Sequence, residues 1–161
     1  MQNCGPSAGR HLHHNQANNH ATTDISTGIF LDHSGGCDLD HNVCNGNLGT
    51  GIYLGAAPNC SVEHNEANNN GLPHSYNAGI GLDMSPDCKV AHNVANGNRM
   101  FGIAVARSCG TVFNQNSAYG NEAYDLFAPD WYPDTAPPSC NSYRDNRGAT
   151  ALPSLEFWDV K

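Results

Sequence analysis

The chain has 161 residues and a formal net charge of −8, with only seven lysine and arginine residues. This charge argues against nucleic acid or an anionic membrane as a partner, because few cations are available to meet phosphate groups. No stretch approaches the roughly 20 consecutive apolar residues that a membrane-spanning helix needs, so membrane insertion is not expected.

Four short segments of the chain are near copies of one another, at residues 28–31, 51–54, 79–82 and 102–105. Each begins with Gly-Ile and is followed by a cysteine, and each cysteine is followed five residues later by an asparagine. The copies and the cysteines that follow them recur at spacings of 21 to 28 residues. A period in this range predicts a solenoid, in which each repeat packs only on its neighbours.

Within each copy, apolar and polar residues alternate with period 2, which predicts half-buried strands. Ile29 and Leu31 alternate with Phe30 and Asp32, and the same alternation recurs over residues 37–40. Helical repeats would need apolar stripes of about ten residues, and leucine-rich repeats about four leucines per copy. Neither is present, so we expect a coil of about three short strands per turn, with turns about 4.8 Å apart.

In such a coil, equivalent residues of successive turns stack into ladders. The predicted interior ladders are Ile29, Ile52, Ile80 and Ile103; Leu31, Leu54, Leu82 and Val105; Cys37, Cys60, Cys88 and Cys109; and Leu12, Leu39, Val62, Val90 and Thr111. A polar ladder of Asn15, Asn42, Asn65, Asn93 and Asn114 is expected at a bend, where asparagine side chains bond to neighbouring amides. Asparagine supplies 21 of the 161 residues, and this role explains much of that excess.

The Gly-Ile-x-Leu…Cys-x-Val-x-His-Asn units resemble the repeats of right-handed parallel β-helix proteins of the pectin-lyase-like superfamily. They are most similar to the periplasmic nitrous-oxide-accessory type, over about residues 10–148. The resemblance implies an all-β, right-handed parallel β-helix and favours an extracytoplasmic location, secreted or periplasmic, with a cytosolic location as the alternative. The length of 161 residues corresponds to five to six coils. Because the superfamily includes lyases, hydrolases, epimerases and adhesins, it does not imply one activity.

The ends of the chain differ from its middle. We expect one domain over residues 1–161, with repeats over about 10–127 and a degenerate last coil and cap over 128–161. Solenoids need a cover over the last rung, and the tail with Phe157 and Trp158 is expected to supply it. No comparable cap precedes residue 10, which suggests a missing upstream segment or end-to-end self-association. Met1 leads into polar sequence, so no signal peptide is expected in this chain.

The chain contains seven cysteines, an odd number for a scaffold of paired disulfides. Four of them fit the predicted ladder as small apolar core residues, with bonds between adjacent rungs as the alternative. Cys4 and Cys140 lie near opposite ends of the predicted coil, so they are not expected to pair with each other.

The outward face of the Gly-Ile strands is the first candidate site. Loops over residues 20–27 and 71–78 flank it and carry His20, Asp24, His74 and Tyr76. Asp32 and Asp83 lie two rungs apart, about 9.6 Å by strand spacing, near the separation of about 6.5–9.5 Å in inverting glycosidases. We therefore predict these two as catalytic carboxylates. The predicted substrate-binding residues are Phe30, His33, Tyr53, His74, Tyr76 and Arg107.

Ordinary solvated side chains and tolerated surface loops are the alternative interpretation of that face. The paired aspartates and Gly-His-Gly of polygalacturonase relatives are absent, as are a lyase calcium cluster and an epimerase Asp-Pro-His motif. These departures leave it open whether the protein is an enzyme.

A second candidate site lies on the next face. Its predicted metal ligands are His11, His13, Asp38, Asp40 and Glu63. Repulsion between Asp40 and Glu63, about 4.8 Å apart, would be relieved by a divalent cation. A site that mixes imidazole and carboxylate ligands suits zinc, whereas a site of carboxylates alone suits calcium. In the alternative interpretation no metal is bound, and solvent and hydrogen bonds from histidine offset the charge of the carboxylates.

A column of histidines precedes the ladder asparagines: His14, His41, His64 and His92. Phe113 is expected to continue this column, which favours stacked packing over a row of metal ligands. The chain is thus predicted to be a carbohydrate-binding or polysaccharide-processing module with a polysaccharide or oligosaccharide partner. The alternatives are a non-catalytic structural or adhesive solenoid, which is part of a larger surface protein, and a metal-associated accessory protein.

Overall fold

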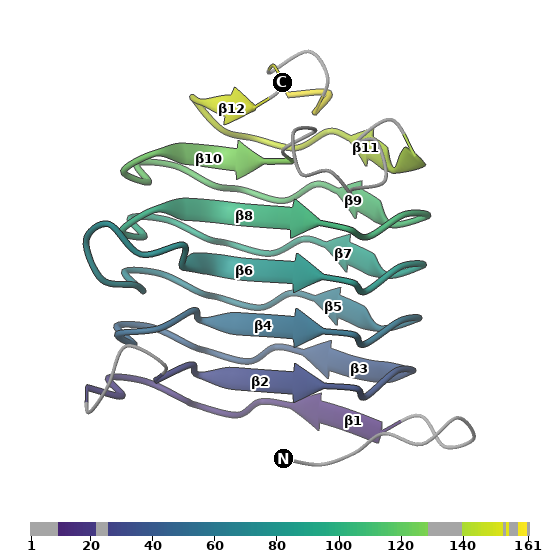
Figure 1. The fold of residues 1–161 in the computed structure, drawn as a ribbon, viewed down its shortest axis with the longest axis horizontal. Helices are drawn as coiled ribbons and strands as arrows, with labels where there is room; N and C mark the ends of the chain where they lie inside the picture. Colours follow the sequence, from purple (N-terminus) through teal and green to yellow (C-terminus); the bar gives the residue numbers. More distant parts are fainter. Residues whose placement is uncertain (1–9, 22–25, 129–139, 153, 155–157, 161) are drawn as a thin grey trace.

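The computed structural model describes residues 10–21, 26–128, 140–152, 154 and 158–160. These residues form a parallel β-solenoid of about six turns (Figure 1). One sheet, which we call the β1 sheet, contains β1 (Arg10–His13), β3 (Cys37–Asp40), β5 (Ser61–Glu63), β7 (Lys89–Ala91), β9 (Val112–Asn114) and β11 (Ser142–Arg144). The β2 sheet contains β2 (Ile29–Asp32), β4 (Ile52–Gly55), β6 (Ala78–Asp83), β8 (Phe101–Ala106), β10 (Tyr124–Phe127) and β12 (Ala151–Leu152).

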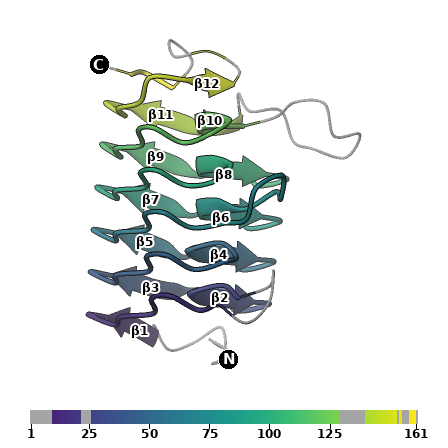
Figure 2. The same ribbon diagram turned by 90° about the vertical axis from the view of Figure 1, so that its left-hand side faces the viewer.

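The two sheets occupy two sides of the coil, as the side view shows (Figure 2). On the third side, single-residue parallel bridges connect Gln16, Val43, Glu66, Val94, Ser117 and Arg147 in turn. All pairings between the described strands are parallel and in register from turn to turn. The predicted fold class is therefore confirmed. The described part contains no helix long and apolar enough to cross a membrane.

The isoleucine ladder forms the centre of the core. Ile29 pairs in register with Ile52, Ile52 with Ile80, and Ile80 with Ile103, which extends to Leu126 in β10. All five side chains are buried. The glycine before each isoleucine is required by space: a β-carbon on Gly79 would lie 2.6 Å from both the Ala67 carbonyl oxygen and the Asn98 side-chain nitrogen. The Gly-Ile pair thus marks a point where neighbouring segments approach too closely for a side chain.

The asparagine ladder is confirmed for its first four members and is wrong at the fifth. The side-chain oxygen of Asn93 accepts hydrogen bonds from Asn65, and the Asn93 backbone and side-chain amides both donate to Asn116 Oδ1, at 3.1 and 3.0 Å. Asn116 bonds in the same way to Asn146. Asn116, not Asn114, therefore continues the ladder.

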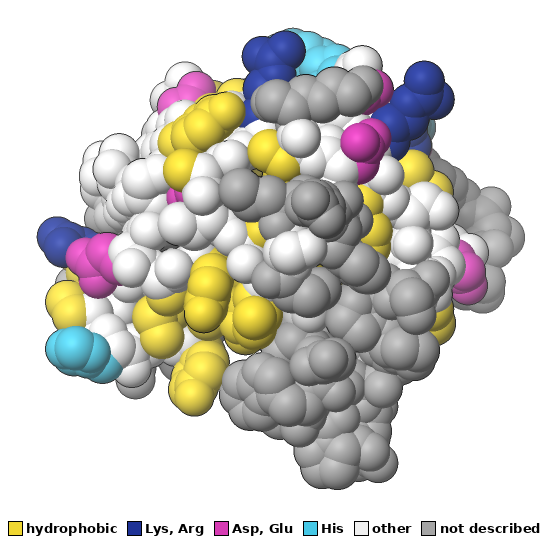
Figure 3. All heavy atoms as spheres, turned by 90° about the horizontal axis from the view of Figure 1, so that it is seen from above, with side chains coloured by type: hydrophobic (Ala, Val, Ile, Leu, Met, Phe, Trp, Pro, Cys, Tyr) yellow, Lys and Arg dark blue, Asp and Glu magenta, His cyan; other side chains and the backbone are white. Residues whose placement is uncertain are grey.

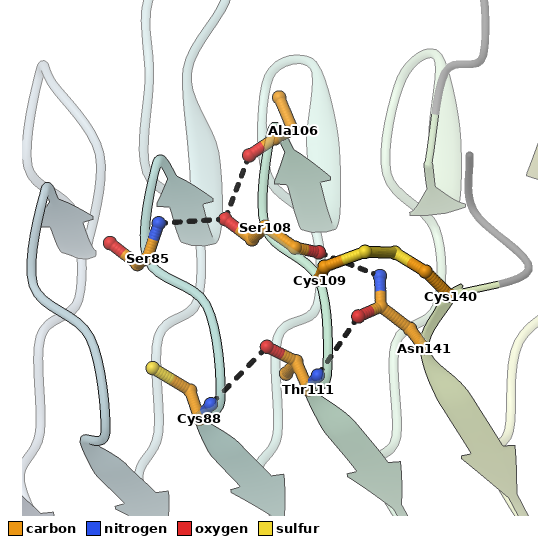
Figure 4. The surroundings of a disulfide bond; sticks show 8 residues. All are labelled: Ser85, Cys88, Ala106, Ser108, Cys109, Thr111, Cys140 and Asn141. Carbon is orange, nitrogen blue, oxygen red and sulfur yellow. Dashed lines mark hydrogen bonds between the residues drawn. A yellow bond between two sulfur atoms is a disulfide. The ribbon is translucent and has the colours of Figure 1, made fainter. Parts of the chain in front are cut away.

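The same two-residue slip affects three other predicted ladders. Thr111, not Cys109, follows Cys88, and its hydroxyl accepts a hydrogen bond from the Cys88 amide (Figure 4). Phe113, not Thr111, pairs with Val90 in the core. Gln115, not Phe113, follows His92 in the histidine column, as its backbone φ of 53° shows. The slip arises because the fourth cysteine lies six residues after its isoleucine, whereas Cys37, Cys60 and Cys88 lie eight residues after theirs.

The cysteines divide into two groups. Cys60 and Cys88 are buried free thiols, as predicted for core residues, and so is Cys44. Burial raises the pKa of the Cys44 thiol to about 12. Cys109 instead forms a disulfide with Cys140 in the next turn (Figure 4), a bond between adjacent turns of the kind that the sequence left as the alternative. Cys37 is also disulfide-bonded.

A second asparagine ladder, which the sequence analysis missed, runs beside the Gly-Ile strands through Asn47, Asn70, Asn98 and Asn121. It ends at the buried carboxylate of Asp125. Asp125 Oδ1 accepts two hydrogen bonds from Asn121, and Oδ2 accepts bonds from the Ala149 and Thr150 amides at 2.8 and 3.0 Å. A carboxylate with four donors thus terminates the ladder and holds the last turn.

We expect Asp125 to make stability dependent on acid pH. Desolvation by burial raises its pKa, but the bonds from Asn121, Ala149 and Thr150 outweigh burial, so the pKa is lowered on folding. A group with a lowered pKa contributes stability that is complete above its unfolded value, near 4, and is lost as pH falls through the folded value. The free energy of unfolding of the wild type, measured with urea, should therefore fall below about pH 4.

Asp125→Asn provides the control for this pH effect. It keeps an acceptor oxygen but removes the titration, so its stability should change less than that of the wild type between pH 5 and pH 3. Equal slopes for the two proteins would contradict the role of Asp125.

Trp158 covers the last turn. Its side chain is fully buried and packs against Phe113 and Tyr143, with ring centroids 5.3 and 4.4 Å away. Burial raises the pKa of Tyr143 to about 12. Residues 129–139, 155–157 and 161, which belong to the predicted cap, and residues 1–9 lie outside the described part.

Candidate functional site

A groove of about 200 Å³ lies on the outer face of the β2 sheet. One column of outward positions runs along this face through Phe30, Tyr53, Gly81, Ala104 and Phe127. Aromatic rings stand at both ends of the column, and the two middle positions carry no side chain or only a methyl group. The groove is therefore the gap between these rings, and its floor is the backbone of β6 and β8.

Tyr53 forms one wall because two glycines make room for its ring. A β-carbon on Gly81 would lie 3.2 Å from Tyr53 Cδ2, and one on Gly55 would lie 3.1 Å from Cε1. The ring thus lies against the sheet instead of projecting from it. Desolvation by burial raises the pKa of Tyr53, and the negative charge of the neighbouring Asp83 carboxylate raises it further.

Asp83 and Arg107 form the polar side of the groove. Arg107 Nε donates to Asp83 Oδ1 at 2.7 Å, and Arg107 Nη2 donates to Oδ2, so the two groups meet as a fork. Arg107 lies at the turn after β8 with φ of 46°, and its side chain reaches Asp83 of the preceding turn. The Asp83–Arg107 pair thus lies beside Tyr53 along this side of the groove.

The opposite wall is apolar and was missed by the sequence analysis. The rings of Phe101 and Phe127 stack with centroids 4.1 Å apart, and both line the groove with Thr50. In the view onto the C-terminal end, one gathering of hydrophobic side chains lies at the lower edge, on the side of the β2 sheet (Figure 3). The sequence does contain a feature that indicates this wall: Phe101 directly precedes the fourth Gly-Ile pair, and in the structure it pairs in register with Ala78.

The loop over residues 71–78 closes one end of the groove through Tyr76, which is 76 % exposed. Ser75 organises this loop: its hydroxyl donates to the Leu72 carbonyl at 2.6 Å and accepts from Asn77 Nδ2 at 2.6 Å. His74, in the same loop, does not line the groove. The other predicted loop includes residues 22–25, and with them Asp24, that lie outside the described part.

The structure brings together four of the eight residues predicted for this face: Tyr53, Tyr76, Asp83 and Arg107. Asp32, Gly55 and Asp83 do follow one another in register, but Asp32 lies beyond Tyr53 and outside the groove. Asp32 is paired with His33, Oδ1 to Nδ1, at 2.8 Å. Phe30 packs on Tyr53 with ring centroids 5.5 Å apart and extends the aromatic row past the groove.

The residues predicted as metal ligands lie in two columns on the outer face of the β1 sheet, His11, Asp38 and Ser61 in one and His13, Asp40 and Glu63 in the other. They do not converge on one point. Glu63 Oε2 is 2.7 Å from Lys89 Nζ, and Glu63 Oε1 accepts from the Ser61 hydroxyl, so a lysine from the next turn offsets its charge. Desolvation raises the Glu63 pKa, but the bonds from Lys89 and Ser61 outweigh it and lower the pKa overall. His11 pairs with Asp38 at 3.1 Å.

The histidine column is stacked, as predicted. The rings of His14 and His41 are 5.2 Å apart, those of His41 and His64 are 4.9 Å apart, and those of His64 and His92 are 4.9 Å apart, all within 9° of parallel. His41 Nδ1 lies 2.6 Å from Asp40 Oδ1. The column therefore runs beside Asp40, one of the predicted ligands.

Comparison with known proteins agrees with this architecture. A family model described as a right-handed beta helix region matches residues 7–131. The chain belongs to the right-handed β-helix family. Its coil is accordingly right-handed, and the resemblance to the pectin-lyase-like superfamily is consistent with this membership. No curated protein and no solved structure matches the chain. Within this β-helix family, the fold suggests a polysaccharide-related or structural module.

Proposed function

We propose that this β-helix binds a carbohydrate in the groove on the β2 sheet. The observation that carries the proposal is the gap over Gly81 and Ala104, between Tyr53 on one side and Phe101 and Phe127 on the other. Binding sites for small ligands combine apolar and aromatic walls with a few placed polar groups. A sugar ring has apolar faces that fit between aromatic walls, and hydroxyl groups that pair with a carboxylate and a guanidinium.

The groove favours binding over hydrolysis. Glycoside hydrolysis needs two carboxyl groups on either side of the scissile bond, one of which must donate a proton. Both oxygens of Asp83 already accept hydrogen bonds from Arg107, and Asp32 is outside the groove with His33 as its partner. A role for Asp83 in accepting hydrogen bonds from sugar hydroxyls fits this environment better than a role as an acid.

A structural or adhesive scaffold is the second candidate. Its support is the uninterrupted stacking of two sheets and two asparagine ladders, which leaves the outer edges of β1 and β2 at the end of the described stack. Such edges accept further strands, which would permit end-to-end association. An extracytoplasmic location is proposed for either function, because the Cys109–Cys140 disulfide fits an oxidising compartment.

A glycan array with matched variants tests the proposal. Tyr53→Ala and Asp83→Asn remove opposite kinds of contact, and Ala104→Leu fills the floor without changing a core residue. Each should weaken binding about tenfold or more, about 1.4 kcal/mol. Tyr119→Ala is the control, because Tyr119 is an exposed tyrosine that does not line the groove. Absence of binding to every glycan, or equal loss in Tyr119→Ala, would favour the scaffold.

A further inference from the structure

We propose that Asp40, His41 and His64 bind one divalent transition-metal ion on the outside of the solenoid. Their ligand atoms, one carboxylate oxygen and two ring nitrogens, all lie within 4.8 Å of one another. The three side chains come from two successive turns, at the end of β3 and just after β5. This site differs from the one predicted from sequence, shares only Asp40 with it, and is separate from the proposed carbohydrate groove.

A hydrogen bond to Asp40 explains the position of His41 but not that of His64. His41 Nδ1 is 2.6 Å from Asp40 Oδ1, which is a strong hydrogen bond. His64 Nδ1 is directed at the same oxygen but lies 3.8 Å from it, beyond hydrogen-bond distance. Two parallel imidazoles thus present equivalent nitrogens to one carboxylate, which satisfies only one of them. A cation among the three atoms would be bonded by all of them.

The distances suit a metal after small movements. Zinc bonds of about 2.1 Å to nitrogen and oxygen place tetrahedral ligand atoms about 3.4 Å apart. The side chains are 42–50 % exposed, so the rings are free to tilt toward one another. Each histidine would bind through the Nδ1 lone pair, with its ring proton on Nε2. Two neutral imidazoles and one carboxylate suit zinc, copper or nickel, and leave a fourth position for water.

The backbone does not explain why histidine occupies this column. All its members have positive φ, including His41 at 53° and His64 at 55°, and in the last turns the same column holds Gln115 and Asp145. A second positive-φ column carries only residues that adopt this conformation readily: Asn19, Gly46, Asn69, Gly97 and Gly120. Asparagine or glycine would thus serve the turn equally well, so the imidazoles at His41 and His64 are available for another purpose.

Isothermal titration calorimetry with zinc chloride, on the full chain without a histidine tag, tests the site. We expect saturable binding of one ion. His64→Asn and Asp40→Asn should each weaken it about tenfold or more. Asparagine tolerates positive φ, so His64→Asn keeps the turn. His92→Asn, one turn along the same stack, and Glu63→Gln, from the set predicted by sequence, should stay within about twofold of the wild type.

Two results would overturn the proposal. One is no saturable binding of zinc to the wild type. The other is an equal loss of affinity in His92→Asn or Glu63→Gln, which would indicate diffuse binding along the whole stack. The circular dichroism spectrum of each variant shows whether it is folded, and His64→Asn alone decides the question if Asp40→Asn is unfolded. With copper(II) in place of zinc, the electron paramagnetic resonance spectrum of the wild type should show nitrogen ligands. The spectrum of His64→Asn should differ from it.

Discussion

Asn116→Ala is expected to lower the free energy of unfolding by about 3–5 kcal/mol. The Asn116 side-chain nitrogen donates to the Val90 carbonyl at 2.8 Å and to Asn146 Oδ1 at 3.0 Å. Its oxygen accepts the two bonds from Asn93. Removal of the amide leaves the Asn93 backbone N–H and the Val90 carbonyl buried without these bonds, and each such group costs about 1–3 kcal/mol. Urea unfolding followed by circular dichroism measures the change.

Asn114→Ala is the matched control, two residues away. Asn114 is the position that the repeated Cys-to-Asn spacing predicts for the ladder. Its side-chain oxygen is buried and has no hydrogen-bond partner among the described residues. Removing such a group should change stability by less than about 1 kcal/mol. A larger loss for Asn114→Ala than for Asn116→Ala would mean that the fifth rung follows the register of the sequence analysis.

This pair of positions shows why repeats predict a solenoid better than they predict each rung. The Gly-Ile copies set the register of the β2 sheet, because Ile103 pairs with Ile80 as expected. The fourth cysteine was then used as a second marker, although it lies six residues after its isoleucine and the others lie eight after theirs. Counting eight residues from Ile103 gives Thr111, which is the true member of the ladder.

The candidate groove was predictable only in part. Period-2 alternation places Tyr53 and Asp83 on the outer face, and both line the groove. The apolar wall depends on β8 beginning at Phe101, one residue before the repeated glycine, and on a fifth rung that brings Phe127 beside it. That rung has no Gly-Ile signature, since Asp125 and Leu126 replace it. The partners of surface side chains are hard to predict for a similar reason: Lys89, one turn away, forms an ion pair with Glu63 that the local sequence does not reveal.

The disulfide and the ladder carboxylate act on the same part of the molecule. Asp125 bonds to the amides of Ala149 and Thr150, and Cys140 joins the turn before β11 to Cys109. Trp158 packs on Tyr143 in β11. The last turn of the described part, whose strands pair with β9 and β10, is thus held by a covalent bond, a charged acceptor and an aromatic cover. Solenoid stability is a sum of turn and interface contributions, so loss of any one should loosen this end first.

Replacing Cys109 and Cys140 together by serine should therefore lower stability by about 3–4 kcal/mol, the chain-entropy contribution of a crosslink between residues 31 apart in sequence. For a chain of this length, that corresponds to a fall in Tm of roughly 10 °C. Hydrogen exchange should show where the loss falls: amides of β11 and β12 should exchange faster, while those of β4 and β6 keep their protection.

The double variant is more informative than a reducing agent, because Cys37 is also disulfide-bonded and reduction would break both bonds. Cys44→Ser is the control for the substitution itself, since Cys44 is a buried free thiol in the centre of the core. In Cys44→Ser, the loss of protection against hydrogen exchange should be spread over the neighbouring turns. The amides of β11 and β12 should lose no more protection than those of β4. Uniform loss of protection along the whole solenoid in the double variant would show that the disulfide stabilises the molecule as one cooperative unit, and the local account of the last turn would then be wrong.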